Sequence, residues 1–279
     1  AYIARSNGEP PAWAPLPVQY ADFAVWQRGV LGSESDPDSL ISSQAAYWKT
    51  ALAGLPDELN LPTDRPRPTT QSFRGGKVLF QIDPQTHRGL SELARQQGST
   101  LFMVLHTALA VFLARMSATD DIAVGTPYAG RGERALDDLV GMFVNTLVLR
   151  TRVRSGMSFA ELIDDVRATD LAAFGHADVP FERLVSELNP VRSDAHNPLF
   201  QVMCNVQRWA FQQSRQLAGM QVDYLVNDAS ATKFDLYLEV TDLDGRLGCC
   251  LTYSRDLFDA PRIARMAEHW QQLLVGLLD

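Results

Sequence analysis

Apolar positions recur along this chain with two different spacings, which predict helices and strands. Apolar residues three and four apart predict amphipathic helices, whereas short compact or alternating apolar runs predict strands. The ranges predicted as helices are 20–30, 38–53, 84–97, 101–116, 158–174, 181–188 and 260–278. The ranges predicted as strands are 76–82, 121–125, 143–150, 200–207, 220–226, 235–242 and 247–253. This order is not strictly βαβ, so we expect an α/β or α+β fold in which helices cover a mixed sheet.

One stretch, from Gly125 to Arg150, combines features that suggest a site. Two strand-like runs flank a glycine-rich, charged link, and the polar pair Asn145 and Thr146 lies within the second apolar run. Long ordered links inside compact domains tend to be functional. Buried amides and hydroxyls need hydrogen-bond partners, either in the protein or in a ligand. We therefore expect this polar pair to mark a site.

Composition narrows the function classes. The 279 residues are 46% hydrophobic, which allows one large domain or two small ones. The chain carries 25 Lys and Arg against 33 Asp and Glu, a formal net charge of -8, so nucleic acid is not an expected partner. Three cysteines without spaced pairs argue against a disulfide framework or a zinc site, and fit a reducing cytoplasm. The longest apolar run, 101–114, is too short to span a bilayer, so no membrane association is expected.

Candidate chemistry is sparse when the residues are read alone. The sequence has no nucleophile elbow, P-loop or dinucleotide-binding glycine motif, and no histidine has metal-ligand spacing. His106 lies in the most apolar predicted helix and is expected to be a core residue. Arg115 could satisfy the terminal carbonyls of that helix or hold a buried carboxylate. The adjacent Asp120 and Asp121 are expected to be solvated.

Four segments, in this order along the chain, resemble the motifs of nonribosomal peptide synthetase condensation domains. They are YADFAVW at 20–26, VGMFVNT at 140–146, HADVPFE at 176–182 and RSDAHNPL at 192–199. The departures are modest: Ala177, Ser193, Ala195 and His196 stand where the family has Gln, Asp, Ser and Arg. The resemblance covers nearly the whole chain, and four motifs in family order are a specific signal.

The resemblance implies a fold like that of chloramphenicol acetyltransferase. Two αβ lobes form a V, and the active site lies in a tunnel between them. The family's signature His-His-x-x-x-Asp-Gly lies upstream of the first motif and is absent from these residues. We therefore expect the C-terminal portion of a condensation domain, with 1–60 as the end of the first lobe and its connector helices, and 61–279 as the second lobe.

The resemblance also implies functional residues. No catalytic residue is expected in this chain, because the signature histidine would lie upstream of Ala1, and the histidine and cysteine spacings predict no metal ligand. The residues expected to support the site or line the tunnel are Arg115, Gly141, Asn145, Thr146, Asp178 and Asn197. Among them, Arg115 resembles the family arginine that pairs with the signature aspartate. Asn145 and Thr146 are expected near the thioester arm.

The expected reaction is peptide-bond formation between thioesters on two peptidyl carrier domains, a donor and an acceptor. The second signature histidine would position or deprotonate the acceptor amine. No cofactor would bind directly apart from the phosphopantetheine arms of the carriers. Further expected partners are adjacent synthetase domains and the missing N-terminal lobe, and without that lobe these residues are expected to be inactive. The alternatives are a non-catalytic recruitment module and an epimerization domain of the same fold.

Overall fold

The described residues contain one mixed sheet of six strands in this computed structural model, which describes residues 2–208, 231–243 and 245–278. The strands are β1 (Gly75–Ile82), β2 (Asp121–Tyr128), β3 (Asn145–Arg152), β4 (Val202–Arg208), β5 (Leu236–Asp242) and β6 (Leu247–Ser254). Their order across the sheet is β1-β6-β5-β4-β2-β3. β4 runs parallel to β2 and β5, and the other neighbours are antiparallel. The predicted mixed sheet is confirmed, while the predicted strand 220–226 lies outside the described residues.

The predicted helices are all present, and several of them begin at a residue whose side chain caps the helix. The helices are α1 (Tyr2–Ser6), α2 (Tyr20–Leu31), α3 (Leu40–Ala51), α4 (Pro84–Gln96), α5 (Leu101–Ser117), α6 (Phe159–Phe174), α7 (Phe181–Leu188) and α8 (Ala260–Gly276). Ser158 forms a capping box with Glu161 at the start of α6, and Thr100 caps α5. A short 3₁₀ helix, Arg134–Leu136, was not predicted.

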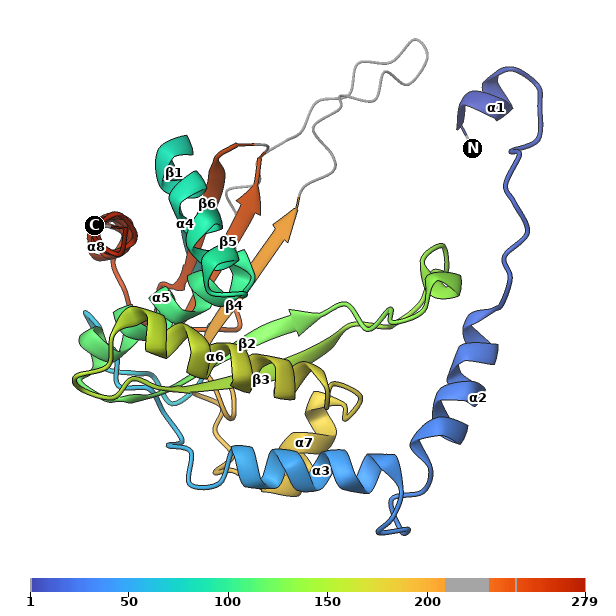
Figure 1. The fold of residues 1–279 in the computed structure, drawn as a ribbon, viewed down its shortest axis with the longest axis horizontal. Coiled ribbons are helices and arrows are strands. Elements are labelled where there is room, and N and C mark those ends of the chain that lie inside the picture. The colour runs from blue at the N-terminus through green and yellow to red at the C-terminus, as the bar shows by residue number, and fades with distance from the viewer. Residues whose placement is uncertain (1, 209–230, 244, 279) are drawn as a thin grey trace.

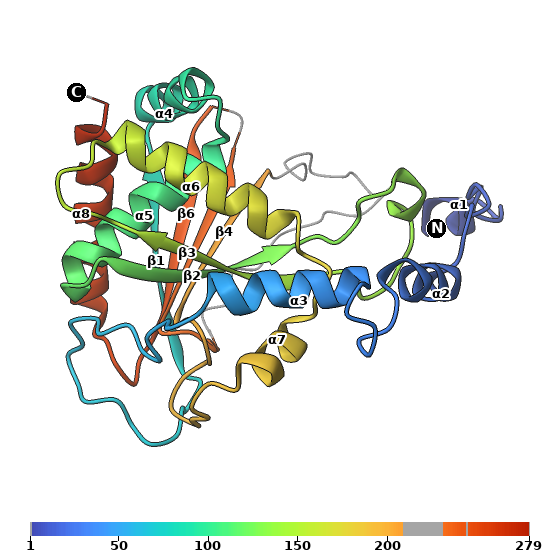
Figure 2. The same ribbon diagram turned by 60° about the horizontal axis from the view of Figure 1, so that its bottom comes forward.

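Four helices cover one face of the sheet (Figures 1 and 2). α5 packs on β2 and α8 on β1 and β6, while α4 and α6 flank α5. The side chains between them form the largest apolar cluster, which includes Leu105, Leu113 and Ile263. Among the described residues, no single helix is long and apolar enough to cross a membrane, and only the pair α4 and α5, bent by 104°, meets that test together. Most of the apolar side chains of α5 are buried in the fold.

A second apolar cluster lies at the β2–β3 end of the sheet, where α3 and α7 pack against each other. Trp48 of α3 is almost fully buried there beside Leu149 of β3 and Leu184 of α7. The indole Nε1 of Trp48 donates to the carbonyl oxygen of His176 at 2.8 Å. This bond fixes the segment that precedes α7.

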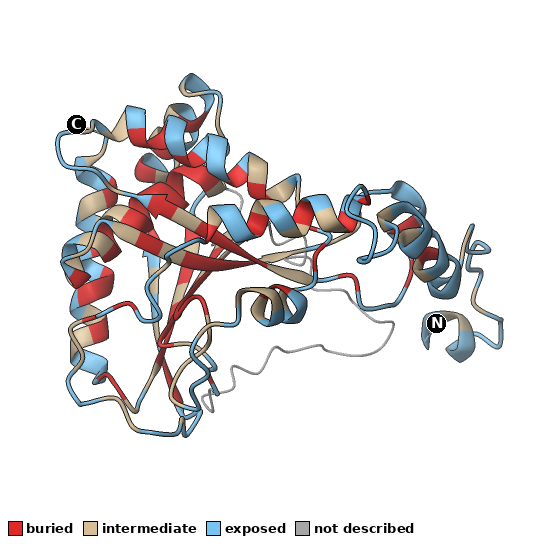
Figure 3. Ribbon diagram, turned by 90° about the horizontal axis from the view of Figure 1, so that it is seen from below, coloured by how far each residue is buried: buried red, intermediate tan, exposed pale blue. Residues whose placement is uncertain are grey.

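Helices α1 and α2 stand apart from the sheet, and the long connection between β2 and β3 reaches toward them (Figures 1 and 2). Figure 3 shows how little of this region is buried: α1 has no buried residue and α2 has only Phe23. Phe23 meets Leu136, Leu139 and Phe143 of the connection in a small third cluster. The connection therefore packs on α2 rather than projecting freely into solvent.

Candidate functional site

Three of the four motif segments line one cavity of about 480 Å³. α2 contributes Phe23 and Trp26, and the end of the β2–β3 connection with the start of β3 contributes Met142 to Thr146. The segment that leads into α7 contributes 177–178 and 180–182. The first and the last of these segments lie more than 100 residues apart in sequence, so only the fold brings them together. The cavity is therefore the candidate site.

Gly141 is needed where the β2–β3 connection touches α2. The Tyr20 hydroxyl donates to the carbonyl oxygen of Met142 at 2.9 Å. A Cβ at Gly141 would lie 2.2 Å from the Tyr20 ring, so only glycine allows this approach. The ring of Tyr20 also meets the ring of Phe143 edge-on, with centroids 5.2 Å apart. Gly141 thus permits a close contact between two motifs.

The Asn145 side chain ties the start of β3 to the segment before α7. Its Nδ2 donates to the carbonyl oxygens of Ala177 and Val179, both at 2.8 Å. Its Oδ1 accepts from the backbone N–H groups of Thr146 at 2.8 Å and Phe181 at 3.0 Å. An amide has two N–H groups and two oxygen lone pairs, so these four bonds use its whole capacity. Contact of Asn145 with a thioester arm stays a prediction, and in this structure its amide has no free hydrogen.

Thr146 and Asp178 differ in whether their side chains form hydrogen bonds. The Thr146 hydroxyl has no hydrogen-bond partner within the described part of the chain and lines the cavity. Asp178 pairs with Gln44 of α3: Gln44 Nε2 donates to the Asp178 carboxylate at 2.8 Å, and the Asp178 N–H donates to Gln44 Oε1 at 3.0 Å. Thr146 therefore offers the free hydroxyl, whereas Asp178 mainly fastens α3 to the start of α7.

Arg115 and Asn197 lie away from this cavity. Arg115 is exposed at the end of α5 and has no ion-pair partner among residues 2–208, 231–243 and 245–278. That end lies near the start of β2, whereas Asn145 pairs with Tyr128 at its far end, roughly 20 Å along the strand. The backbone oxygen of Asn197 accepts from Gln201 Nε2 at 3.1 Å. The structure therefore brings Asn145, Thr146 and Asp178 to the cavity and Gly141 next to it, but not these two.

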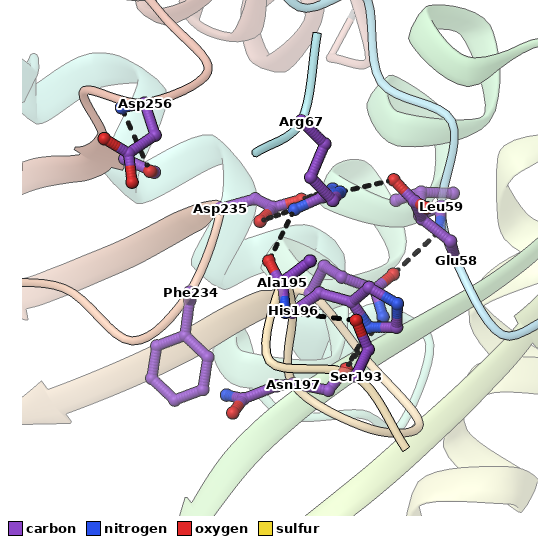
Figure 4. Close-up of polar contacts among 12 residues, drawn as sticks. Glu58, Leu59, Arg67, Ser193, Ala195, His196, Asn197, Phe234, Asp235 and Asp256 are labelled. Carbon is purple, nitrogen blue, oxygen red and sulfur yellow. Dashed lines mark hydrogen bonds and ion pairs between the residues drawn. The ribbon is translucent and has the colours of Figure 1, made fainter. Parts of the chain in front are cut away.

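A buried ion pair between Arg67 and Asp235, which sequence reasoning missed, holds the loop that contains Asn197 (Figure 4). Arg67 donates to both carboxylate oxygens of Asp235, at 2.8 and 2.5 Å, and to Glu58 at 2.6 Å. It also donates to the carbonyl oxygen of Ala195 at 3.4 Å. Burial raises the pKa of Asp235, although the hydrogen bonds and charge of Arg67 oppose this. The only local signal was an Arg-Pro-Arg-Pro run, whose prolines fix an extended backbone.

The expectation that Asp121 is solvated was wrong. Both of its carboxylate oxygens accept hydrogen bonds from Arg150, at 2.8 and 2.6 Å. The Asp121 side chain is only 17% exposed and the Arg150 side chain 10%. The remaining nitrogen of Arg150 donates to the carbonyl oxygens of Ala51 and Ala53 at the end of α3. Arg150 therefore joins both strands of the hairpin to the end of α3. Asp120 is exposed, as expected.

Fold and site together define the class of this protein. The model of the condensation domain family matches residues 1–279. The chain belongs to the condensation domain family of nonribosomal peptide synthetases, and its mixed sheet with helices has the chloramphenicol acetyltransferase-like fold of that family.

Individual relatives agree with this assignment. The chain is 47% identical over 284 residues to a dimodular nonribosomal peptide synthase of Bacillus subtilis, covering 98% of this chain and 12% of that protein. It is 42% identical over 283 residues to an isonitrile lipopeptide synthase of Mycobacterium tuberculosis, covering 99% and 11%. The chain thus spans only a small part of these relatives.

Among solved structures, the X-domain from teicoplanin biosynthesis superposes with a TM-score of 0.88 at 30% identity, covering 99% of this chain and 63% of the other. A complex of that X-domain with OxyB gives the same TM-score and identity, with 61% of the other chain covered.

Proposed function

We propose that these residues form part of a condensation domain that makes peptide bonds between carrier-bound aminoacyl or peptidyl thioesters. The acceptor amine attacks the donor thioester carbonyl, the C–N bond forms and the C–S bond breaks. The amine proton leaves, and the donor phosphopantetheine is released as a thiol. The observation that carries the proposal is the family match along all 279 residues.

Within this proposal, the described residues shape and hold the substrate path. Asn145 and Asp178 fasten the elements around the cavity, and the Thr146 hydroxyl would bind a polar group of a phosphopantetheine arm. Arg115 stays the proposed partner of the signature aspartate; its exposure and its lack of a partner in the described ranges are compatible with that role. Asn197 would support the loop beside β5.

We further propose that the 279 residues alone do not catalyse the reaction. They contain no adjacent pair of histidines, and the family resemblance assigns the general base to such a pair. The test incubates this chain with donor and acceptor carriers loaded with amino acids, beside an intact domain that contains it. We expect dipeptidyl carrier only from the intact domain. Turnover by the 279 residues alone would overturn this part of the proposal.

A recruitment role is the second candidate, favoured by one observation. A structure 30% identical to this chain is an X-domain solved in complex with OxyB. If this chain served such a role, the intact domain would bind a partner enzyme and form no peptide bond with any pair of loaded carriers. The same assay therefore separates the two candidates, because dipeptide formation by the intact domain excludes a purely recruiting role.

A further inference from the structure

The sheet face that points away from α5 and α8 carries polar side chains. In strands, alternate residues point to opposite faces, and residues paired across strands share a face. The register therefore places Asn205 of β4, Glu239 of β5 and Cys250 of β6 side by side, followed by Leu79 of β1. Tyr237 of β5 lies on the same face. Leu79 is 68% exposed and the other four side chains are half-buried. This face is thus accessible in the described structure.

Glu239 is the notable residue on this face. Its carboxylate has no ion-pair partner within the described part of the chain, although it is half-buried. The pKa of the neighbouring Tyr237 hydroxyl is raised to about 12, first by burial and then by the negative charge of Glu239, to which this hydroxyl also donates a hydrogen bond, while a hydrogen bond from Asn205 opposes the rise. A partly desolvated carboxylate without a cation gains from a positively charged ligand. An adjacent aromatic ring adds to the attraction for a cation.

A row of aromatic rings connects this carboxylate with the cavity. Phe181, which lines the cavity, contacts Phe200 with ring centroids 5.6 Å apart. Phe200 stacks on Phe234 at 5.7 Å, and Phe234 meets Tyr237 at 6.0 Å. A Cβ at Gly125 of β2 would lie 2.2 Å from the Phe200 ring, so this ring sits directly on the strand. The row therefore runs over the same face of the sheet, from the cavity to Glu239.

We propose that Asn205, Tyr237 and Glu239 bind the side chain of one of the two carrier-bound aminoacyl groups and favour an ammonium or guanidinium side chain. This inference rests on the proposed function. The Tyr237 ring at the end of the aromatic row would contact the methylene stem of such a side chain, and Glu239 would accept hydrogen bonds from its charged end. A neutral side chain of equal length would gain the apolar contact only.

The test measures substrate preference in the intact domain that contains this chain. Lysyl and norleucyl groups are loaded in turn at the donor and at the acceptor carrier, and the rate of dipeptide formation is measured for each combination. Both probes carry the same α-amine, so their difference isolates the side-chain ammonium. We expect a preference for lysyl at one of the two positions, and Glu239→Gln should reduce that preference by about tenfold without changing the norleucyl rate.

Glu268→Gln is the matched control, because Glu268 is exposed on α8, on the other side of the sheet. It should leave the preference unchanged. No preference for lysyl at either position, or equal losses for lysyl and norleucyl in Glu239→Gln, would overturn the inference. Should that variant fail to fold by circular dichroism, Tyr237→Phe serves instead and should weaken the preference.

Absence of dipeptide from every combination would count against the proposed function rather than against this inference. In that case calorimetry tests the inference by measuring how tightly the domain binds lysyl-aminopantetheine and norleucyl-aminopantetheine. Tighter binding of the lysyl probe, lost in Glu239→Gln, would support the inference, and equal binding of both probes would overturn it.

Discussion

Replacing Asn145 with alanine tests whether this motif residue holds the site together or takes part in the chemistry. The substitution removes four hydrogen bonds at once, two to carbonyl oxygens and two from backbone N–H groups. All four bonds join the start of β3 to its own next residue, to the segment before α7 or to the first residue of α7. Asn145→Ala should therefore lower stability and loosen the α7 segment from β3.

The expected magnitude follows from these four bonds. A typical intramolecular hydrogen bond contributes about 1 kcal/mol net, and more when its former partners stay buried without a replacement. Asn145 is half-buried, so water can reach some of the groups that lose it. We expect Asn145→Ala to lower the free energy of unfolding by about 3 kcal/mol, which is near the upper end for single substitutions.

Urea denaturation of the intact domain, read by far-UV circular dichroism, measures this loss, and dipeptide formation measures turnover per folded molecule. Asn60→Ala is the control, since Asn60 is exposed and its side chain has no hydrogen bond in the described structure. It should change stability by less than about 0.5 kcal/mol. The reasoning is refuted if Asn145→Ala unfolds like the wild type while its turnover falls by orders of magnitude.

Two further predictions concern close packing and buried thiols. Gly141→Ala should push the β2–β3 connection off the Tyr20 ring and speed hydrogen–deuterium exchange in 131–143, whereas Gly132→Ala, which meets no neighbour within 4 Å, should not; equal exchange in both would contradict the contact. Burial raises the pKa of Cys204 and of Cys249 to about 12. An unfolded thiol titrates near 8.5, so the folded state holds these protons longer and stability should fall as the pH rises above about 8.5. Denaturation midpoints from pH 7 to 10 should fall less steeply when both cysteines are replaced by alanine, and identical slopes would count against this coupling.

The limits of sequence reasoning here follow from the range of the interactions. Helices and strands were predictable because periodicity and caps act within a few residues, as Ser158 with Glu161 shows. The pairing of Arg67 with Asp235 spans 168 residues, and no local pattern encodes it. The same applies to Asp121, whose partner becomes adjacent only through the β2–β3 register. Sequence reasoning thus found the polar motif at Asn145 but could not identify its partners.

The motif residues around the cavity mostly hold other segments rather than leaving groups free for a ligand. Tyr20, Asn145 and Asp178 each form hydrogen bonds with an element far away in sequence. Bonds of this kind fix the shape of the cavity, so their loss should affect every substrate alike. Under the two proposals above, selection between substrates depends instead on Thr146, which lines the cavity, and on Glu239 of the sheet face. This division explains why a motif match defines the family but leaves the substrate open, and why the Glu239 preference assay is the sharper test.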